Sequence, residues 1–163
     1  MSITKVLVVS DSHGEVGNML LAAELVRPQL LIHLGDGWRD VQRLRRLLPE
    51  LPCEQVPGNC DYRVHEPAER ILELEGKRVY LCHGHTQGVK TDLAMVLRTA
   101  MERGAEVLLF GHTHKPFVDI RSGVVMLNPG SISAPLRPTC GTLTFENGTC
   151  TAATRMLPQQ GCT

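Results

Sequence analysis

The sequence predicts an α/β fold in which two mixed sheets face each other and helices lie outside them. In the first half of the chain, short apolar runs alternate with segments of helical periodicity. In the second half, short apolar runs follow one another, separated by Gly, Pro or Asn, as antiparallel strands are. Four apolar runs end directly at residues able to bind metals. Sites form outside the carboxyl ends of strands in open α/β sheets, so we expect these ends to converge at one edge.

The first half contains three predicted strands and two predicted helices. Residues 4–9 and 30–34 are apolar runs typical of buried strands, and a short strand is expected to end at the turn containing Gly58. Apolar residues recur at helical spacing over residues 14–27 and 38–48, which predicts a helix in each range.

The second half is predicted to be mostly strand. Residues 70–75 and 78–81 have the pattern of a hairpin, residues 91–105 that of a helix, and residues 107–110 that of a buried strand. Four further strands are expected at residues 117–120, 123–127, 141–145 and 150–155. The tail from Pro158 is expected to fray.

The composition fits one globular domain, and we expect a single domain over residues 1–163. Lys plus Arg equals Asp plus Glu, 17 each, so the chain has no net charge to gather nucleic acid or an anionic membrane. No apolar run approaches the ~20 residues of a membrane span and no secretory cleavage site precedes the first strand, so we expect a cytoplasmic protein. The six cysteines are scattered without a C-x-x-C pair and are expected to be free thiols.

The predicted strand ends carry imidazole, carboxylate and amide groups. These are Asp11 and His13, Asp36, Asn59, His83 and His85, and His112 and His114. Such a mixed set suits Mn, Fe, Co, Ni or Zn rather than an all-oxygen Ca or Mg site. Because seven or eight candidate ligands exceed the needs of one ion, we expect two ions ~3.5–4 Å apart, bridged by a carboxylate. Such a pair activates water for attack on phosphorus.

These residues resemble the calcineurin-like metallophosphoesterases, and within them the small YfcE-like phosphodiesterases. The resemblance covers about residues 4–136. It rests on Asp11-x-His13, Gly35-Asp36, Gly58-Asn59, His83-Gly84-His85, Gly111-His112-x-His114 and Asn128-Pro129-Gly130-Ser131, in the family's order. The resemblance implies a four-layer α/β/β/α sandwich, a dinuclear metal centre and metal-dependent hydrolysis of a small phosphodiester.

The resemblance also implies a role for each motif residue. The implied ligands are Asp11, His13 and His114 for one ion, Asn59, His83 and His112 for the other, and Asp36 as the bridge. Asn59 would also touch a phosphate oxygen, and His85 would lie beside the centre as a support or a substrate contact. Asn59, Asp36 and His85 are therefore the catalytic candidates. Manganese is the first metal expected, with Ni, Fe, Co and Zn as alternatives.

Three residues close in sequence to the implied ligands are not ligands themselves. Cys60 stands where larger members of the family carry a histidine thought to protonate the leaving group, although the YfcE-like group shares the cysteine. A thiol with an ordinary pKa near ~8.5 matches neutral pH less well. We therefore expect a preference for esters whose leaving oxygen needs no proton, such as aryl phosphodiesters. Trp38 either shapes the rim of the site or contacts substrate, and His33 is expected to be a buried supporting residue.

The same set of site residues is also compatible with other functions. A phosphomonoesterase would need further cationic contacts, and a nuclease is disfavoured because the chain is neutral and poor in aromatic residues. A non-catalytic scaffold, as in the retromer subunit of this fold, is the alternative from another class, although none of the seven implied ligands is missing. We expect no membrane association, and exposed edge strands in the second half would permit a homodimer.

Overall fold

The computed structural model describes residues 3–158, and its strands and helices follow the predicted order. The first half contains β1 (Thr4–Val9), α1 (Val16–Val26), β2 (Leu30–His33), α2 (Trp38–Leu47) and β3 (Cys53–Gln55). The second half contains β4 (Glu69–Leu74), β5 (Lys77–Cys82), α3 (Ala94–Glu102), β6 (Val107–Leu109), β7 (Pro116–Arg121), β8 (Val124–Pro129), β9 (Thr139–Glu146) and β10 (Thr149–Met156). Cys162 and the tail beyond residue 158 lie outside the described residues.

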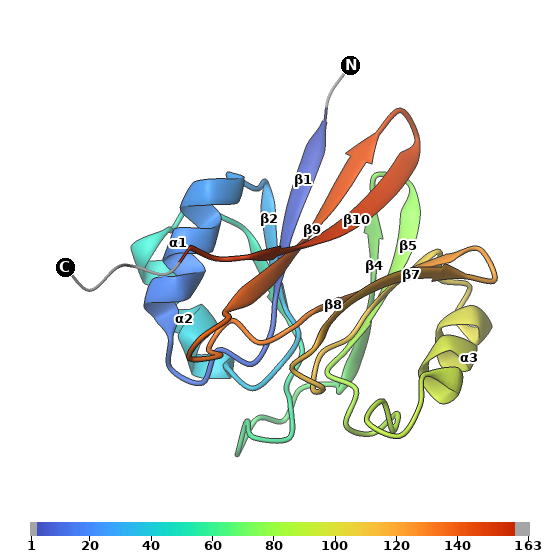
Figure 1. Ribbon diagram of the computed structural model, residues 1–163, viewed down its shortest axis with the longest axis horizontal. Coiled ribbons are helices and arrows are strands. Elements are labelled where there is room, and N and C mark those ends of the chain that lie inside the picture. Colours follow the sequence, from blue (N-terminus) through green and yellow to red (C-terminus); the bar gives the residue numbers. More distant parts are fainter. Residues whose placement is uncertain (1–2, 159–163) are drawn as a thin grey trace.

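Two mixed five-stranded sheets form the centre of the molecule, which confirms the predicted fold class (Figure 1). The strand order is β10-β9-β1-β2-β3 in the first sheet and β4-β5-β6-β8-β7 in the second. In the first sheet β1, β2 and β3 are parallel, whereas β9 and β10 are antiparallel additions. In the second sheet β5, β6 and β8 are parallel, a pairing of β8 that the pattern of short runs did not predict.

Three apolar clusters hold the layers together. Helices α1 and α2 pack on the outer face of the first sheet, with Met19 and Leu44 against Leu31. Val8 and Ile32 from the first sheet pack against Leu109 and its neighbours from the second. Helix α3 covers the second sheet in a third cluster. The layers are therefore helices, sheet, sheet and helix, as expected.

Several boundaries differ from the predicted ones by a few residues, and two of the differences affect loops near the site. Helix α3 begins at Ala94 rather than near residue 91, because the N–H groups of Thr91 and Asp92 both donate to the carbonyl of Gly88 in a preceding turn. Strand β3 ends at Gln55, so most of the stretch before Gly58 is loop.

The parallel strands bring the predicted site residues to one edge of the sandwich. The loops that follow β1, β2, β3, β5 and β6 lie together at the lower edge in Figure 1. Within residues 3–158, no helix combines the length and apolar character that crossing a membrane requires.

Candidate metal centre

The turns that carry the predicted ligands have strained backbones. Five of these residues lie in the left-handed region, with φ of 57° for Asp11, 40° for His13, 60° for Asp36, 70° for His112 and 62° for His114. Non-glycine residues rarely adopt this region, and each costs about 1–3 kcal/mol unless its surroundings fix it. Here the turns after β1 and β2 fix each other. The Asp11 N–H donates to the Gly35 carbonyl at 2.9 Å, and the His13 N–H to the Asp36 carbonyl at 3.1 Å.

Glycines allow these turns to approach closely. A Cβ atom on Gly58 would lie 2.2 Å from Oδ1 of Asp36, and one on Gly35 would lie 2.6 Å from Nδ1 of His83. A Cβ atom on Gly111 would lie 2.2 Å from Oγ of Ser10. The glycines beside Asp36, Asn59 and His112 are thus required by packing against another turn of the centre.

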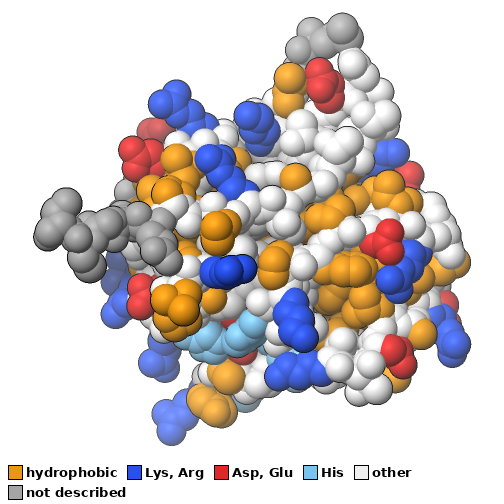
Figure 2. Space-filling view, viewed as in Figure 1, with side chains coloured by type: hydrophobic (Ala, Val, Ile, Leu, Met, Phe, Trp, Pro, Cys, Tyr) orange, Lys and Arg blue, Asp and Glu red, His pale blue; other side chains and the backbone are white. Residues whose placement is uncertain are grey.

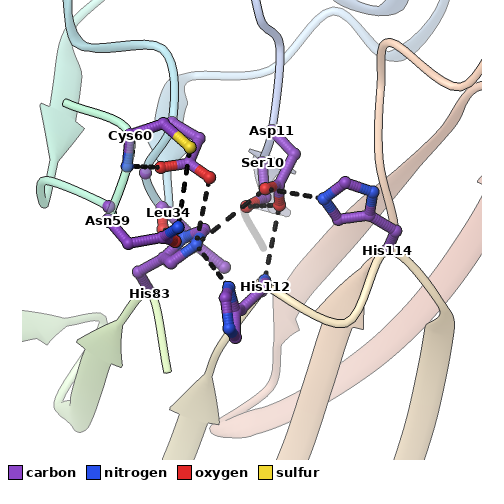
Figure 3. Close-up of polar contacts among 12 residues, drawn as sticks. Ser10, Asp11, Leu34, Asn59, Cys60, His83, His112 and His114 are labelled. Atoms are coloured by element: carbon purple, nitrogen blue, oxygen red, sulfur yellow. Dashed lines mark hydrogen bonds and ion pairs between the residues drawn. The ribbon is translucent and has the colours of Figure 1, made fainter. Parts of the chain in front are cut away.

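Two buried carboxylates lie among the histidines (Figure 3). Oδ1 of Asp11 is 3.1 Å from Nε2 of His114, 3.7 Å from Nε2 of His13 and 3.9 Å from Nε2 of His83. Oδ2 of Asp36 is 3.3 Å from Nε2 of His83 and 3.9 Å from Nε2 of His13. The donor atoms form two groups, Asp11 with His13 and His114, and Asp11 with Asp36 and His83, each within 4.8 Å.

The donor set fits a divalent cation. Nδ1 of His83 lies 2.8 Å from the Leu34 carbonyl, which can only accept, so Nδ1 carries a proton. In the neutral ring, the lone pair on Nε2 then points toward the two carboxylates and Nδ1 of His112, 3.1 Å away. A cation between these atoms, or a proton on the ring nitrogens of His83 or His112, relieves the repulsion between converging lone pairs.

The ionisation of the cluster agrees with this conclusion. Burial alone would raise the pKa of Asp36, but hydrogen bonds from His83 and the Cys60 N–H outweigh it and lower that pKa below its ordinary value. Burial would also lower the pKa of His83, but the hydrogen bond to Asp36 and the charges of Asp11 and Asp36 raise it. The centre therefore favours one or more positive charges between its carboxylates.

Asn59 and His85 lie beside this cluster. The exposed Asn59 side chain points toward the cluster in Figure 3, and its Nδ2 lies 3.5 Å from Sγ of Cys60. The His85 ring centroid is 5.4 Å from that of His83 and 6.2 Å from that of His112. Among the described residues, the buried Nδ1 of His85 has no hydrogen-bond partner. The structure thus brings together all eight predicted site residues, and their individual roles stay predictions.

Asp61 supports the centre in a way that the sequence did not indicate. Its Oδ2 accepts hydrogen bonds from the N–H groups of Asp36 and Gly58, both at 2.8 Å, and its Oδ1 accepts one from Trp38 at 3.0 Å. One carboxylate therefore joins the turn after β2 to the loop after β3. The sequence showed only a carboxylate near a glycine turn, because three backbone donors from two segments leave no local signal.

A buried chain of hydrogen bonds runs behind the two carboxylates. The Gly35 N–H donates to Nδ1 of His33 at 3.1 Å, so in the neutral ring Nε2 carries the proton and donates to Oγ of Ser12 at 2.8 Å. The Ser12 hydroxyl donates to Oδ2 of Asp40 at 2.6 Å, and the Gly14 N–H donates to the same oxygen at 2.8 Å. Burial lowers the pKa of His33 to about 4 against the raising effect of nearby carboxylates. His33 thus lies neutral behind the site.

The end of β8 and the segment after it support the turns that contain Asp11 and Gly111. Oγ of Ser131 and Oγ of Ser133 donate to the Asp11 carbonyl at 3.1 Å and 2.7 Å. Nδ2 of Asn128 donates to the Gly111 carbonyl at 3.1 Å and to Oγ1 of Thr113 at 2.9 Å. Asn128 and Ser131 belong to a predicted motif, whereas Ser133 has no sequence signal that separates it from other loop serines.

Comparison with known proteins gives consistent family matches. The model of the calcineurin-like phosphoesterase superfamily domain matches residues 4–148. A probable metallophosphoesterase, YsnB of Bacillus subtilis, is 36% identical over 162 residues, covering 96% of this chain and 92% of its own. Phosphodiesterase YfcE of Escherichia coli K12 is 35% identical over 158 residues, covering 80% of each chain.

Solved structures with low sequence identity show the same fold. A predicted phosphoesterase from Streptococcus pneumoniae superposes with a TM-score of 0.76 at 22% identity, covering 95% of this chain and 99% of its own. Vps29 of Entamoeba histolytica in complex with zinc superposes with a TM-score of 0.70 at 21% identity, covering 95% of this chain and 100% of its own.

Proposed function

Because this chain belongs to the calcineurin-like phosphoesterase superfamily, we propose that it is a metal-dependent phosphodiesterase with a dinuclear centre. One observation carries the proposal. Oδ2 of Asp36 lies 3.9 Å from Nε2 of His13 and 3.3 Å from Nε2 of His83, which the family resemblance assigns to different ions. A carboxylate between two sets of imidazoles is what a shared ligand requires.

In this proposal the ligand sets are Asp11, His13 and His114, then Asn59, His83 and His112, with Asp36 between them. When bound, the metal ions supply Lewis acidity and an activated water at neutral pH. The residues of the chain position these ligands. The strained turns and the Asp61 carboxylate hold Asp36 in place, which keeps the two sets at a fixed separation. Manganese is the first metal to test.

The catalytic candidates are the bridging Asp36, Asn59, which is also in a ligand set, and His85. The exposed Asn59 amide can donate to a nonbridging phosphate oxygen, and the half-buried His85 lies beside the centre, where its ring can support those of His83 and His112 or contact substrate. Cys60 is exposed overall. Partial desolvation of its thiol and the charge of Asp36 still raise the thiol pKa, which makes it a weaker acid. This supports turnover of aryl phosphodiesters, whose leaving oxygen needs no proton.

The experiment is hydrolysis of bis(4-nitrophenyl) phosphate by metal-stripped protein to which Mn, Ni, Zn or Mg is added singly. We expect metal-dependent turnover and a loss of about 100-fold or more in Asp36→Asn, since even the partners of ligands contribute 10–100-fold. The matched control is Asp119→Asn, at an exposed aspartate on β7 that pairs with Arg121. Turnover of 4-nitrophenyl phosphate in preference to the diester would favour a monoesterase. Bound metal without turnover of either ester would favour a scaffold.

A further inference from the structure

We propose that a pocket beside the metal centre binds an aromatic group of the substrate against Trp38 and Tyr62. The inference rests on the proposed function, because it places the phosphate of the same substrate at the centre. It assigns a substrate class, phosphodiesters that carry an aryl or heteroaryl group, and two residues that select it.

The pocket opens directly from the site. Its volume is about 250 Å³, and the ligand candidates His13 and Asp36 form one side of it. The start of α2 supplies Trp38, and the loop after β3 supplies Tyr62 and Val64. Sites for drug-sized ligands are typically ~300–1,000 Å³, so this pocket suits a single ring system. In Figure 2 hydrophobic side chains lie beside the histidines at the lower edge of the molecule.

The acidic groups of the pocket are already engaged by the protein. Both carboxylate oxygens of Asp61 accept backbone hydrogen bonds, and Oδ2 of Asp40 accepts from Ser12 and Gly14. Besides these carboxylates and the exposed Arg39, a ligand meets the side chains of Trp38, Tyr62 and Val64. Such a surface selects a ring by its shape and π face.

The two aromatic residues differ in how firmly they are held. Trp38 is half-buried, and its backbone N–H donates to Oδ1 of Asp61 at 3.0 Å, which fixes the backbone from which its side chain extends. The Tyr62 side chain is 79% exposed. An aromatic side chain this exposed gains little from folding, whereas a planar ligand in the pocket would cover it.

Phenylphosphonate and methylphosphonate test the inference, because neither can be hydrolysed and they differ only in the ring. Both are titrated into Mn-loaded protein while the emission of Trp38, the single tryptophan of the chain, is recorded. We expect phenylphosphonate to bind about tenfold more tightly and to change the emission more than methylphosphonate does. In Tyr62→Ala the ratio of the two dissociation constants should fall toward one, with Trp38 alone left to contact the ring, and Tyr62→Phe should restore the ratio because it keeps the aromatic ring.

The matched control is Ile120→Ala, which removes a 66% exposed apolar side chain from β7 and should leave the ratio unchanged. An emission that phenylphosphonate leaves unchanged, or a ratio that Tyr62→Ala leaves unchanged, would overturn the aromatic pocket. These readouts do not depend on turnover. If the protein prefers phenylphosphonate but hydrolyses no diester, the result would support the aromatic pocket and contradict the proposed phosphodiesterase function.

Discussion

The buried His33 predicts a defined acid sensitivity. Its pKa is about 4 in the folded protein against an ordinary value of 6.5, because burial disfavours the imidazolium and Nδ1 must accept the Gly35 N–H. Between these two pH values the unfolded chain binds the proton and the folded protein does not. Stability contributed by the neutral ring is therefore full above pH 6.5 and is lost as the pH falls toward 4.

The two pKa values set the size of the effect. Lowering the pH from 7.5 to 4.5 should remove about 2–3 kcal/mol of the free energy of unfolding through His33 alone. In His33→Asn the side chain cannot titrate, although its Oδ1 can still accept the Gly35 N–H. The variant should be less stable by about 1–3 kcal/mol at pH 7.5, from lost packing and hydrogen bonding. At pH 4.5 the difference in stability from the wild type should be smaller by about 2–3 kcal/mol.

Urea unfolding of metal-stripped protein at the two pH values measures this gap, and the other titrating groups contribute equally to both proteins. His65→Asn makes the same substitution at an exposed histidine and should follow the wild type at both pH values. A stability gap between His33→Asn and the wild type that is the same at pH 7.5 and 4.5 would refute the neutral His33 and the hydrogen-bond directions inferred from it.

Three further predictions concern the centre itself. Gly58→Ala should lower turnover at least about tenfold, because its Cβ would meet Oδ1 of Asp36, whereas Gly17→Ala, with open space around it in α1, should keep turnover and add up to about 1 kcal/mol of stability. Metal at 100 times its dissociation constant should add about 2.7 kcal/mol and raise the melting temperature by about 5–10 °C, and calorimetry that shows no shift despite bound metal would contradict a centre formed on folding. Cys60→His should raise turnover of alkyl diesters relative to aryl diesters, and an unchanged ratio would show that the cysteine does not set this preference.

The sequence predicted most of the fold because most strands are short apolar or alternating runs bounded by a turn. The ends of β1, β2, β5 and β6 could be placed together because parallel strands share an edge. The start of α3 was missed because the Gly88 turn satisfies backbone groups that helical spacing alone assigns to the helix.

Residues that act across the fold were harder to predict. Asp40 in α2 and Ser133 in a loop bind segments far away in the chain, and nothing in their sequence neighbourhoods distinguishes them from other polar residues of a helix or loop. Tyr62 gained a candidate role only when the loop after β3 was seen beside α2. Contacts of this kind depend on how loops fold against one another, which periodicity does not encode.

The left-handed turns at Asp11, His13, Asp36, His112 and His114 also limit how this protein can diverge. Asp, Asn and His tolerate that backbone far better than β-branched or bulky residues do. Selection for the backbone and selection for a donor atom therefore favour the same few amino acids. A descendant that gave up the chemistry would still be expected to keep Asp, Asn, His or Gly at these positions, so their presence in a distant homologue is weaker evidence of activity than it looks.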